Sequence, residues 1–203
     1  MVALGHAMAH PFEMSCVRST REAPAYWRDV GTVDAYWQAN LDLTDPLPEL
    51  DMYDEEWPVW TYQEQLPPAK FVHDEKGRRG HAVDSLVSGG CIISGARVRR
   101  SVLFSSVHIH SYAAVEECVV LPQVDIGEHC ALRRVVVDKG CRIPAGIPLG
   151  FDATEHARLF NRNGQGGVLG TRDMLQGAQR QPNPASGAEQ RGRRSARTPT
   201  TPP

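Results

Sequence analysis

The sequence of 203 residues contains no apolar run that approaches the roughly 18 residues of a membrane-spanning helix. Its first ten residues, MVALGHAMAH, lack the charged start and continuous apolar core of a secretion signal. Neither sign of charge is in excess, since 22 basic and 24 acidic residues give a formal net charge of −2. These features argue against a membrane or nucleic-acid surface, and they predict a cytoplasmic protein whose partners are small molecules and proteins.

The cysteines are few, odd in number and without a CxxC pair: Cys16, Cys91, Cys118, Cys130 and Cys141. Such spacing provides neither a disulfide framework nor a zinc site, so we expect these thiols to act as small buried apolar side chains. His6 and His10 have the spacing of metal ligands on a helix, but no third ligand is close in the sequence, and they predict no metal site.

The first 43 residues end in an amphipathic segment. Val33, Trp37 and Leu41 recur every four residues, which predicts a short helix that buries aromatic surface. Residues 1–43 therefore read as the closing piece of a larger α/β body.

Residues 44–84 are rich in proline and in turn-forming sequences such as DEKGRRG, and they predict a connector with little regular structure. The connector contains Trp57, Trp60, Tyr62 and Phe71. Because such side chains are costly to leave in water, we expect this segment to lie along other surfaces of the protein.

A six-residue period begins near residue 85. Aliphatic residues fall six apart in three series: Leu103, Ile109, Val115 and Leu121; then Val120, Ile126 and Leu132; then Val137, Ile143 and Leu149. This period is typical of a parallel β-helix, in which each hexad forms one side of a triangular coil and three hexads complete it. The single-residue slips between series predict irregular corners. A β-sandwich is the alternative, but its hairpin turns of NG or DG type are absent from this region.

The chain after the repeat falls into two parts that differ in composition. The segment FDATEHARLF at 151–160 has helical spacing, and GGVLGTRDML at 166–175 predicts a strand and a turn that close the open end of the coil. We expect residues 85–176 to form one domain. Residues 177–203 are almost without apolar side chains, and they are predicted to be disordered.

Three strings resemble successive parts of bacterial glucose-1-phosphate adenylyltransferases: YWRDVGTVDAYWQANLDL, PELDMYDEEWPVWTYQEQLPPAKFV, and SLVSGGCIISG with the repeats that follow it. The resemblance covers residues 9–175. It implies a mainly β protein with a left-handed parallel β-helix of hexapeptide repeats, preceded by the last segment of an α/β nucleotidyltransferase domain. It also implies a homotetramer that makes ADP-glucose and pyrophosphate from ATP and glucose 1-phosphate for glycogen biosynthesis.

The resemblance assigns one catalytic-domain residue. In the family's WRDVGT motif the aspartate is one of two ligands of Mg²⁺, and here it is Asp29. From the residues alone, Asp29 is also a candidate helix cap or a partner for Arg28. The glycine-rich ATP loop, the second metal-binding aspartate and the sugar-phosphate lysine of the family have no counterpart in this sequence. We therefore expect no complete catalytic or ATP-binding site, and no activity from this chain alone.

The family is allosteric, and the resemblance implies that Lys139 and Arg172 contact the phosphates of effectors. Basic side chains suit this role because phosphate is best held by charge-assisted hydrogen bonds. From the residues alone, a solvated surface is the favoured interpretation of both.

Two alternatives remain at this stage. A non-catalytic regulatory or assembly subunit would pair with a separate catalytic chain through the β-helix. A hexapeptide-repeat acyltransferase would use a histidine as general base, and His108, His110 and His129 lie in or near the coils.

Overall fold

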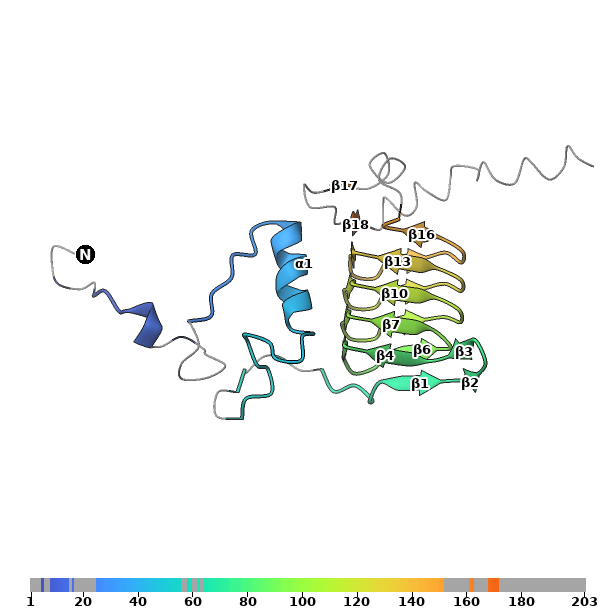
Figure 1. Cartoon of the computed structure of the whole chain (residues 1–203), viewed down its shortest axis with the longest axis horizontal. Helices are drawn as coiled ribbons and strands as arrows, with labels where there is room; N and C mark the ends of the chain where they lie inside the picture. Colours follow the sequence, from blue (N-terminus) through green and yellow to red (C-terminus); the bar gives the residue numbers. More distant parts are fainter. Residues whose placement is uncertain are drawn as a thin grey trace, which may run out of the picture.

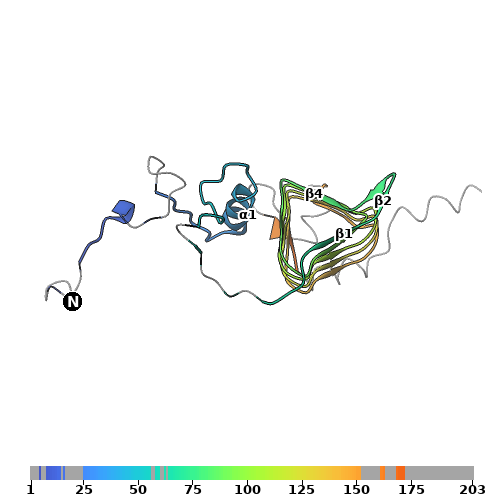
Figure 2. The same cartoon turned by 90° about the horizontal axis from the view of Figure 1, so that it is seen from below.

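The computed structural model describes residues 5, 8–14, 16, 25–55, 58–59, 62, 64–151, 161–162 and 168–171. Short strands wind into a stack of triangular coils, and one α-helix lies along the outside of the stack (Figures 1 and 2). A 3₁₀ turn, η2 (Phe12–Met14), precedes the helix. The predicted mainly β protein with a parallel β-helix is confirmed.

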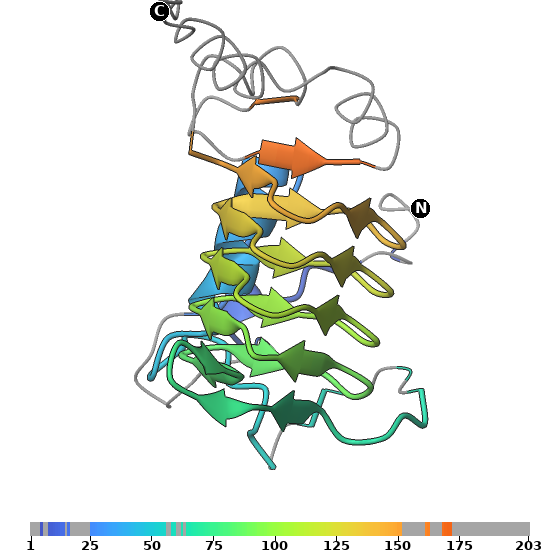
Figure 3. The ribbon, with the colours of Figure 1, turned by 90° about the vertical axis from the view of Figure 1, so that its right-hand side faces the viewer.

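The coil has three faces, each a sheet of parallel strands that are neighbours in space but not in sequence. Face A consists of β1 (Lys70–Val72), β6 (Ile92–Ser94), β9 (His108–Ile109), β12 (Asp125–Ile126) and β15 (Arg142–Ile143). Face B consists of β4 (His81–Val83), β7 (Arg97–Arg99), β10 (Ala114–Glu116), β13 (Ala131–Arg133) and β16 (Pro148–Leu149). Face C consists of β5 (Leu86–Val87), β8 (Val102–Leu103), β11 (Val119–Val120), β14 (Val135–Val137) and β18 (Val168–Gly170), with β17 (Asn161–Arg162) antiparallel to β18. Figure 3 shows the strands stacked coil upon coil.

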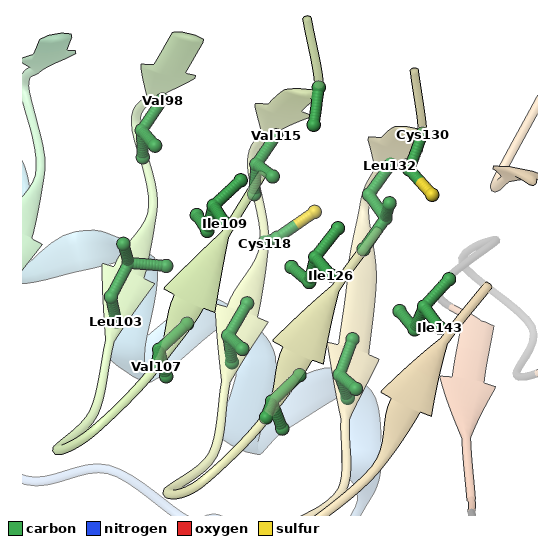
Figure 4. Close-up of a cluster of buried hydrophobic side chains, with 14 of the residues drawn as sticks. Val98, Leu103, Val107, Ile109, Val115, Cys118, Ile126, Cys130, Leu132 and Ile143 are labelled. Atoms are coloured by element: carbon green, nitrogen blue, oxygen red, sulfur yellow. The ribbon is translucent and has the colours of Figure 1, made fainter. Parts of the chain in front are cut away.

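Inward side chains form columns along the axis of the coil. On face A, Ile93, Ile109, Ile126 and Ile143 are register partners, and each is at most 1% exposed. Equivalent aliphatic columns run along faces B and C, and together they make one continuous core (Figure 4). Burial of these columns is the main favourable contribution to the fold, since the hydrophobic effect scales with the apolar area removed from water.

The coils are shorter than three full hexads predict. In the last coils, partners in neighbouring turns are 17 residues apart, as Ala114 and Ala131 are; Ile92 and His108 are 16 apart. One residue is missing at the corner from face B to face C, where only five positions separate inward Val115 from inward Val120. The 16-residue turn lacks a second residue, between inward Ile93 and inward Val98. The six-residue period predicts Leu121 as an inward residue. This prediction was wrong, because Val120 takes that position and Leu121 is only half-buried.

The short corner from face B to face C depends on left-handed backbone directly after each strand. Glu117 has φ 52° and Arg134 has φ 56°. Gly150 occupies the same place after β16 with φ 88°, and a Cβ there would lie 1.7 Å from the Arg133 carbonyl oxygen. Only glycine fits at that last corner, because both the backbone conformation and the available space exclude a side chain.

The coil starts earlier than the sequence pattern suggests. Strands β1 and β4 lie within the segment predicted as connector, and a hairpin of β2 (Asp74–Glu75) and β3 (Arg78–Arg79) joins them. These first strands are partly exposed, so their residues carry no clear apolar period. The expectation that the connector aromatics are covered was wrong for Tyr62 and Phe71, which are 87% and 44% exposed; Trp57 and Trp60 lie outside the described residues.

The predicted helix is α1 (Val33–Asp42). Thr32 caps its start, because the Oγ1 atom accepts a hydrogen bond from the backbone N–H of Ala35 at 3.1 Å. Trp37 and Leu41 are buried against Val119 and Val136, which point outward from face C. Both surfaces of this face are therefore covered, and this explains why Val135, Val136 and Val137 of β14 are all buried.

The remaining predictions concern the thiols and the last part of the chain. Cys91, Cys118, Cys130 and Cys141 are buried free thiols, as expected, whereas Cys16 is half-exposed. The strand predicted within 166–175 is β18, which extends face C. The helix predicted at 151–160 and the disorder predicted for 177–203 lie outside the described residues.

Candidate functional site

The segment before α1 carries the residue that the sequence marks as a metal ligand. Asp29 is exposed, and its Oδ1 atom accepts a hydrogen bond from the backbone N–H of Gly31 at 2.9 Å. This bond closes a turn that leads into Thr32, so Asp29 shapes the entry to the helix while Thr32 caps it. The turn leaves Oδ2 as the oxygen that Asp29 could offer to a cation.

Arg28, next to Asp29, does not pair with it. The Nη2 atom of Arg28 lies 3.2 Å from Oδ2 of Asp42 and 3.0 Å from Oε2 of Glu49. These contacts tie the segment before the helix to the helix end and to the chain that follows. Because the pairs are at least partly exposed, each contributes modestly to stability, but together they fix the path of this segment.

A shallow hollow of ≈ 460 Å³ opens beside Asp29. Its lining is mostly polar: Arg28, Asp29, Thr32, Asp34, Ala35, Gln38, Ala39 and Asp42. Carboxylate oxygens are the ligands that Mg²⁺ prefers, and Mg²⁺ is commonly held by one or two carboxylates together with substrate phosphates. Asp29 fits the role of one such ligand. Within the described ranges, the only group of three or more potential metal ligands is elsewhere, at His108, His110 and Asp125.

The predicted effector residue Lys139 lies at the corner after β14 and is exposed. Its backbone N–H donates to the Oδ1 atom of Asp138 at 2.8 Å, and the N–H of Asp138 donates to the carbonyl of Gly170 at 3.0 Å. The Lys139 corner is therefore held against the end of β18. Arg172, the second predicted effector residue, lies outside the described residues.

Polar contacts fix α1 on the coil, and none of them was predicted from the sequence. The indole Nε1–H of Trp37 donates to the carbonyl of Glu117 at 2.8 Å, and the guanidinium of Arg134 lies 5.0 Å from the centre of the Trp37 ring. Nearby, Arg100 lies 3.6 Å from Asp45. Arg100, Glu117 and Arg134 occupy equivalent corners of successive coils, so the recurrence of charged residues at this spacing was the available signal.

This architecture has known counterparts. A family model described as GlmU-like, C-terminal hexapeptide matches residues 67–169, and the chain belongs to this family. Among curated proteins, the glucose-1-phosphate adenylyltransferase of Albidiferax ferrireducens is 65% identical over 176 residues, which are 87% of this chain and 42% of that protein. Those of Rhodopseudomonas palustris strain TIE-1 and Dechloromonas aromatica are 58% and 60% identical, over 87% and 84% of this chain and 42% and 39% of those proteins.

The resemblance to glucose-1-phosphate adenylyltransferases is thus confirmed, and the match lies in the C-terminal part of these proteins. The chain spans about two fifths of the length of the relatives it matches. Among the described residues, no helix combines the length and the apolar character needed to cross a membrane.

Proposed function

We propose that this chain acts as the C-terminal part of a glucose-1-phosphate adenylyltransferase in the cytoplasm. The reaction joins the sugar phosphate oxygen to the α-phosphorus of ATP and releases pyrophosphate, giving ADP-glucose for glycogen synthesis. The observation that carries the proposal is the 65% identity to a protein of that name over 87% of the chain.

The part played by this chain follows from the way its elements are joined. In this proposal the β-helix supports a homotetramer and responds to phosphorylated effectors, while the segment at Asp29 completes a catalytic site built mainly by other residues. The helix after Asp29 is anchored to the coil by Trp37, so the position of the segment depends on face C.

Face C also connects the predicted effector site at Lys139 with the helix that follows Asp29. Lys139 lies at the corner after β14, and Val136 of the same strand contacts α1. Gly170, two residues before Arg172 in the chain, is hydrogen-bonded to the Lys139 corner. An effector phosphate bound by Lys139 and Arg172 would therefore bias an element that packs directly on the helix behind Asp29. Coupling of this kind requires only that the effector favour one packing of that element.

Mg²⁺ would be held in part by Asp29, through the oxygen that its turn does not use. When bound, the ion would neutralise charge on the phosphates, which is the largest electrostatic need of phosphoryl and nucleotidyl transfer. Asp29 itself orients that ligand oxygen through its hydrogen bond with Gly31.

We further propose that the chain alone does not make ADP-glucose. The test is a synthesis assay with Mg²⁺, ATP and glucose 1-phosphate, run on the purified chain, on the Albidiferax ferrireducens relative without its C-terminal domain, and on the mixture. Activity of the chain alone would contradict the proposal. Activity that appears only in the mixture would support a complementing regulatory part, and no activity in either would favour a non-catalytic assembly subunit.

The effector site is tested in the same mixture, or in a chimera in which this chain replaces the C-terminal part of the Albidiferax ferrireducens relative. Lys139→Ala should weaken activation by a phosphorylated glycolytic intermediate about tenfold or more, because a charge-assisted contact to phosphate is lost. Lys76→Ala is the matched control, since Lys76 is also exposed but lies in the β2–β3 hairpin. Equal activation constants for the two variants would remove Lys139 from the effector site.

A further inference from the structure

Three side chains with metal-binding chemistry meet on the outer surface of face A. His108 belongs to β9, His110 follows this strand, and Asp125 belongs to β12 in the next coil. The imidazole rings of His108 and His110 have centroids 4.0 Å apart, at an interplanar angle of 34°. The Asp125 carboxylate contacts both rings.

The fold fixes this arrangement through strand geometry. Side chains alternate across a strand, so His108 and His110 share the outer surface while Ile109 between them points into the core. His108 and Asp125 are register partners on adjacent strands. The backbone N–H groups of both histidines donate to the neighbouring coil at 2.9 Å, and the framework under the three side chains is therefore rigid.

The distances are close to those of a coordinated ion. The Nε2 atom of His110 lies 3.4 Å from Oδ1 of Asp125, and the Nδ1 atom of His108 lies 4.0 Å from Oδ2. All three ligand atoms are within 4.8 Å of one another. Bonds of about 2.1 Å in a tetrahedral zinc site put neighbouring ligand atoms about 3.4 Å apart. Small side-chain rotations would bring the trio into this geometry without moving the backbone.

The three side chains are also open to solvent. About a third of each of the three side chains is exposed, so an ion and a water molecule could reach them from solvent.

An ion pair between Asp125 and a protonated histidine is the simpler interpretation of the same contacts. An ion pair requires a protonated imidazole, whereas a metal ion binds both rings through their ring nitrogens and accounts for all three ligand atoms, which lie within 4.8 Å of one another. On the outer surface of face A, the register partner of His108 in the preceding coil is Ile92, and that of Asp125 in the following coil is Arg142. These two residues limit the site to the three side chains.

We propose that His108, His110 and Asp125 bind one divalent transition-metal ion, with Zn²⁺ the best match to two imidazoles and one carboxylate and a water in the fourth position. The site joins two successive coils of face A. It is separate from the Asp29 segment, which offers only oxygen ligands, and it does not depend on the proposed adenylyltransferase function.

Isothermal titration of the untagged full-length chain with ZnCl₂, after treatment with a chelator, tests the proposal. We expect saturable binding of Zn²⁺ at this site, weakened at least tenfold by His108→Ala, His110→Ala or Asp125→Asn. His81→Ala is the matched control, because His81 is a strand histidine on face B. Binding by the control should equal that of the unaltered chain.

Two further readouts separate coordination from a structural role. Co²⁺ in the same site should give the strong visible absorption of a tetrahedral ion, and this absorption should be lost in the three site variants. Zn²⁺ should also raise the melting temperature of the unaltered chain but not that of His110→Ala. Circular dichroism verifies that the variants fold. Absence of saturable binding, or equal zinc affinity in the unaltered chain and in all three site variants, would overturn the proposal.

Discussion

Adjacent residues of one short strand experience opposite environments in this coil. Ile93 of β6 is fully buried between coils, whereas Ile92 beside it faces outward and is 38% exposed. The inward position allows no relaxation, because its neighbours above and below are held by the same column. The cost of a substitution should therefore depend on the face and not on the residue type.

Ile93→Ala should lower the free energy of unfolding by about 2–5 kcal/mol, since it removes buried surface and leaves a cavity. Ile92→Ala is the matched change on the opposite surface and should cost less than about 1 kcal/mol. Urea denaturation followed by circular dichroism measures both. Equal losses in the two variants would show that the column does not govern stability.

Buried thiols give the coil a distinct response to alkali. Burial raises the pKa of Cys118 to about 12, although backbone hydrogen bonds act against this rise. In the unfolded chain the thiol has its ordinary pKa, so the folded state binds the proton more tightly. The resulting stabilisation is complete below about pH 9 and is lost as the pH rises toward 12.

The same shift predicts chemical inertness. Because its pKa is raised, buried Cys118 stays protonated at pH 8.5, and we expect iodoacetamide to leave it unmodified in the folded protein. Half-exposed Cys16 serves as an internal control and should be alkylated. Mass spectrometry of tryptic peptides, with and without urea, measures both sites. Modification of Cys118 at the rate of Cys16 without urea would contradict the burial.

At the scale of elements, α1 is held on face C by a small number of specific contacts. Its apolar stripe was visible in the sequence, because Val33, Trp37 and Leu41 recur at helical spacing. The partner surface was harder to predict, since a strand such as Val135–Val137 shows three apolar residues in a row without saying what covers its outer side.

Trp37→Phe tests this docking. Phenylalanine keeps most of the apolar contact but loses the N–H that donates to Glu117, so the change should cost about 1–3 kcal/mol. Hydrogen exchange measured by mass spectrometry should show faster exchange in residues 33–42. Trp27→Phe is the control, because Trp27 is 67% exposed. Unchanged exchange in the Trp37 variant would mean that the indole contact does not hold the helix.

For the whole molecule, the sequence predicted the repeat and its parallel winding but misjudged its limits. The six-residue period is strong where both strand neighbours exist, and it disappears in β1 and β4, whose exposed residues are under no apolar constraint. The single-residue slips between the series predicted irregular corners, but they did not predict the geometry, in which left-handed backbone at Glu117 and Arg134 shortens one corner.

The two candidate sites also differ in how far the sequence could predict them. Asp29 was found through a motif, and its metal role stays a prediction. The cluster at His108 and Asp125 could not be found by spacing, since its ligands are 17 residues apart and meet only when the register of neighbouring coils is known.

Removal of residues 1–43 should uncover the outer surface of face C, where Val119 and Val136 are buried by α1. We expect the shortened chain to bind the dye ANS and to lose solubility, because a contiguous apolar patch would face water. Removal of residues 177–203, which the sequence predicts to be disordered, is the control and should change neither property. A soluble shortened chain without dye binding would show that the helix is dispensable.

The arrangement of helix and coil also has a mechanical consequence. The chain runs from α1, which lies against β11, down to β1 in the first coil, so a pull on the N-terminal side would detach the helix before it reached the strands. The strands would then peel away turn by turn, because each coil is bonded only to its neighbours. A turn of 17 residues releases about 60 Å of extended chain. Stretched from its ends, the protein would lengthen in regular steps, each the length of one unwound turn.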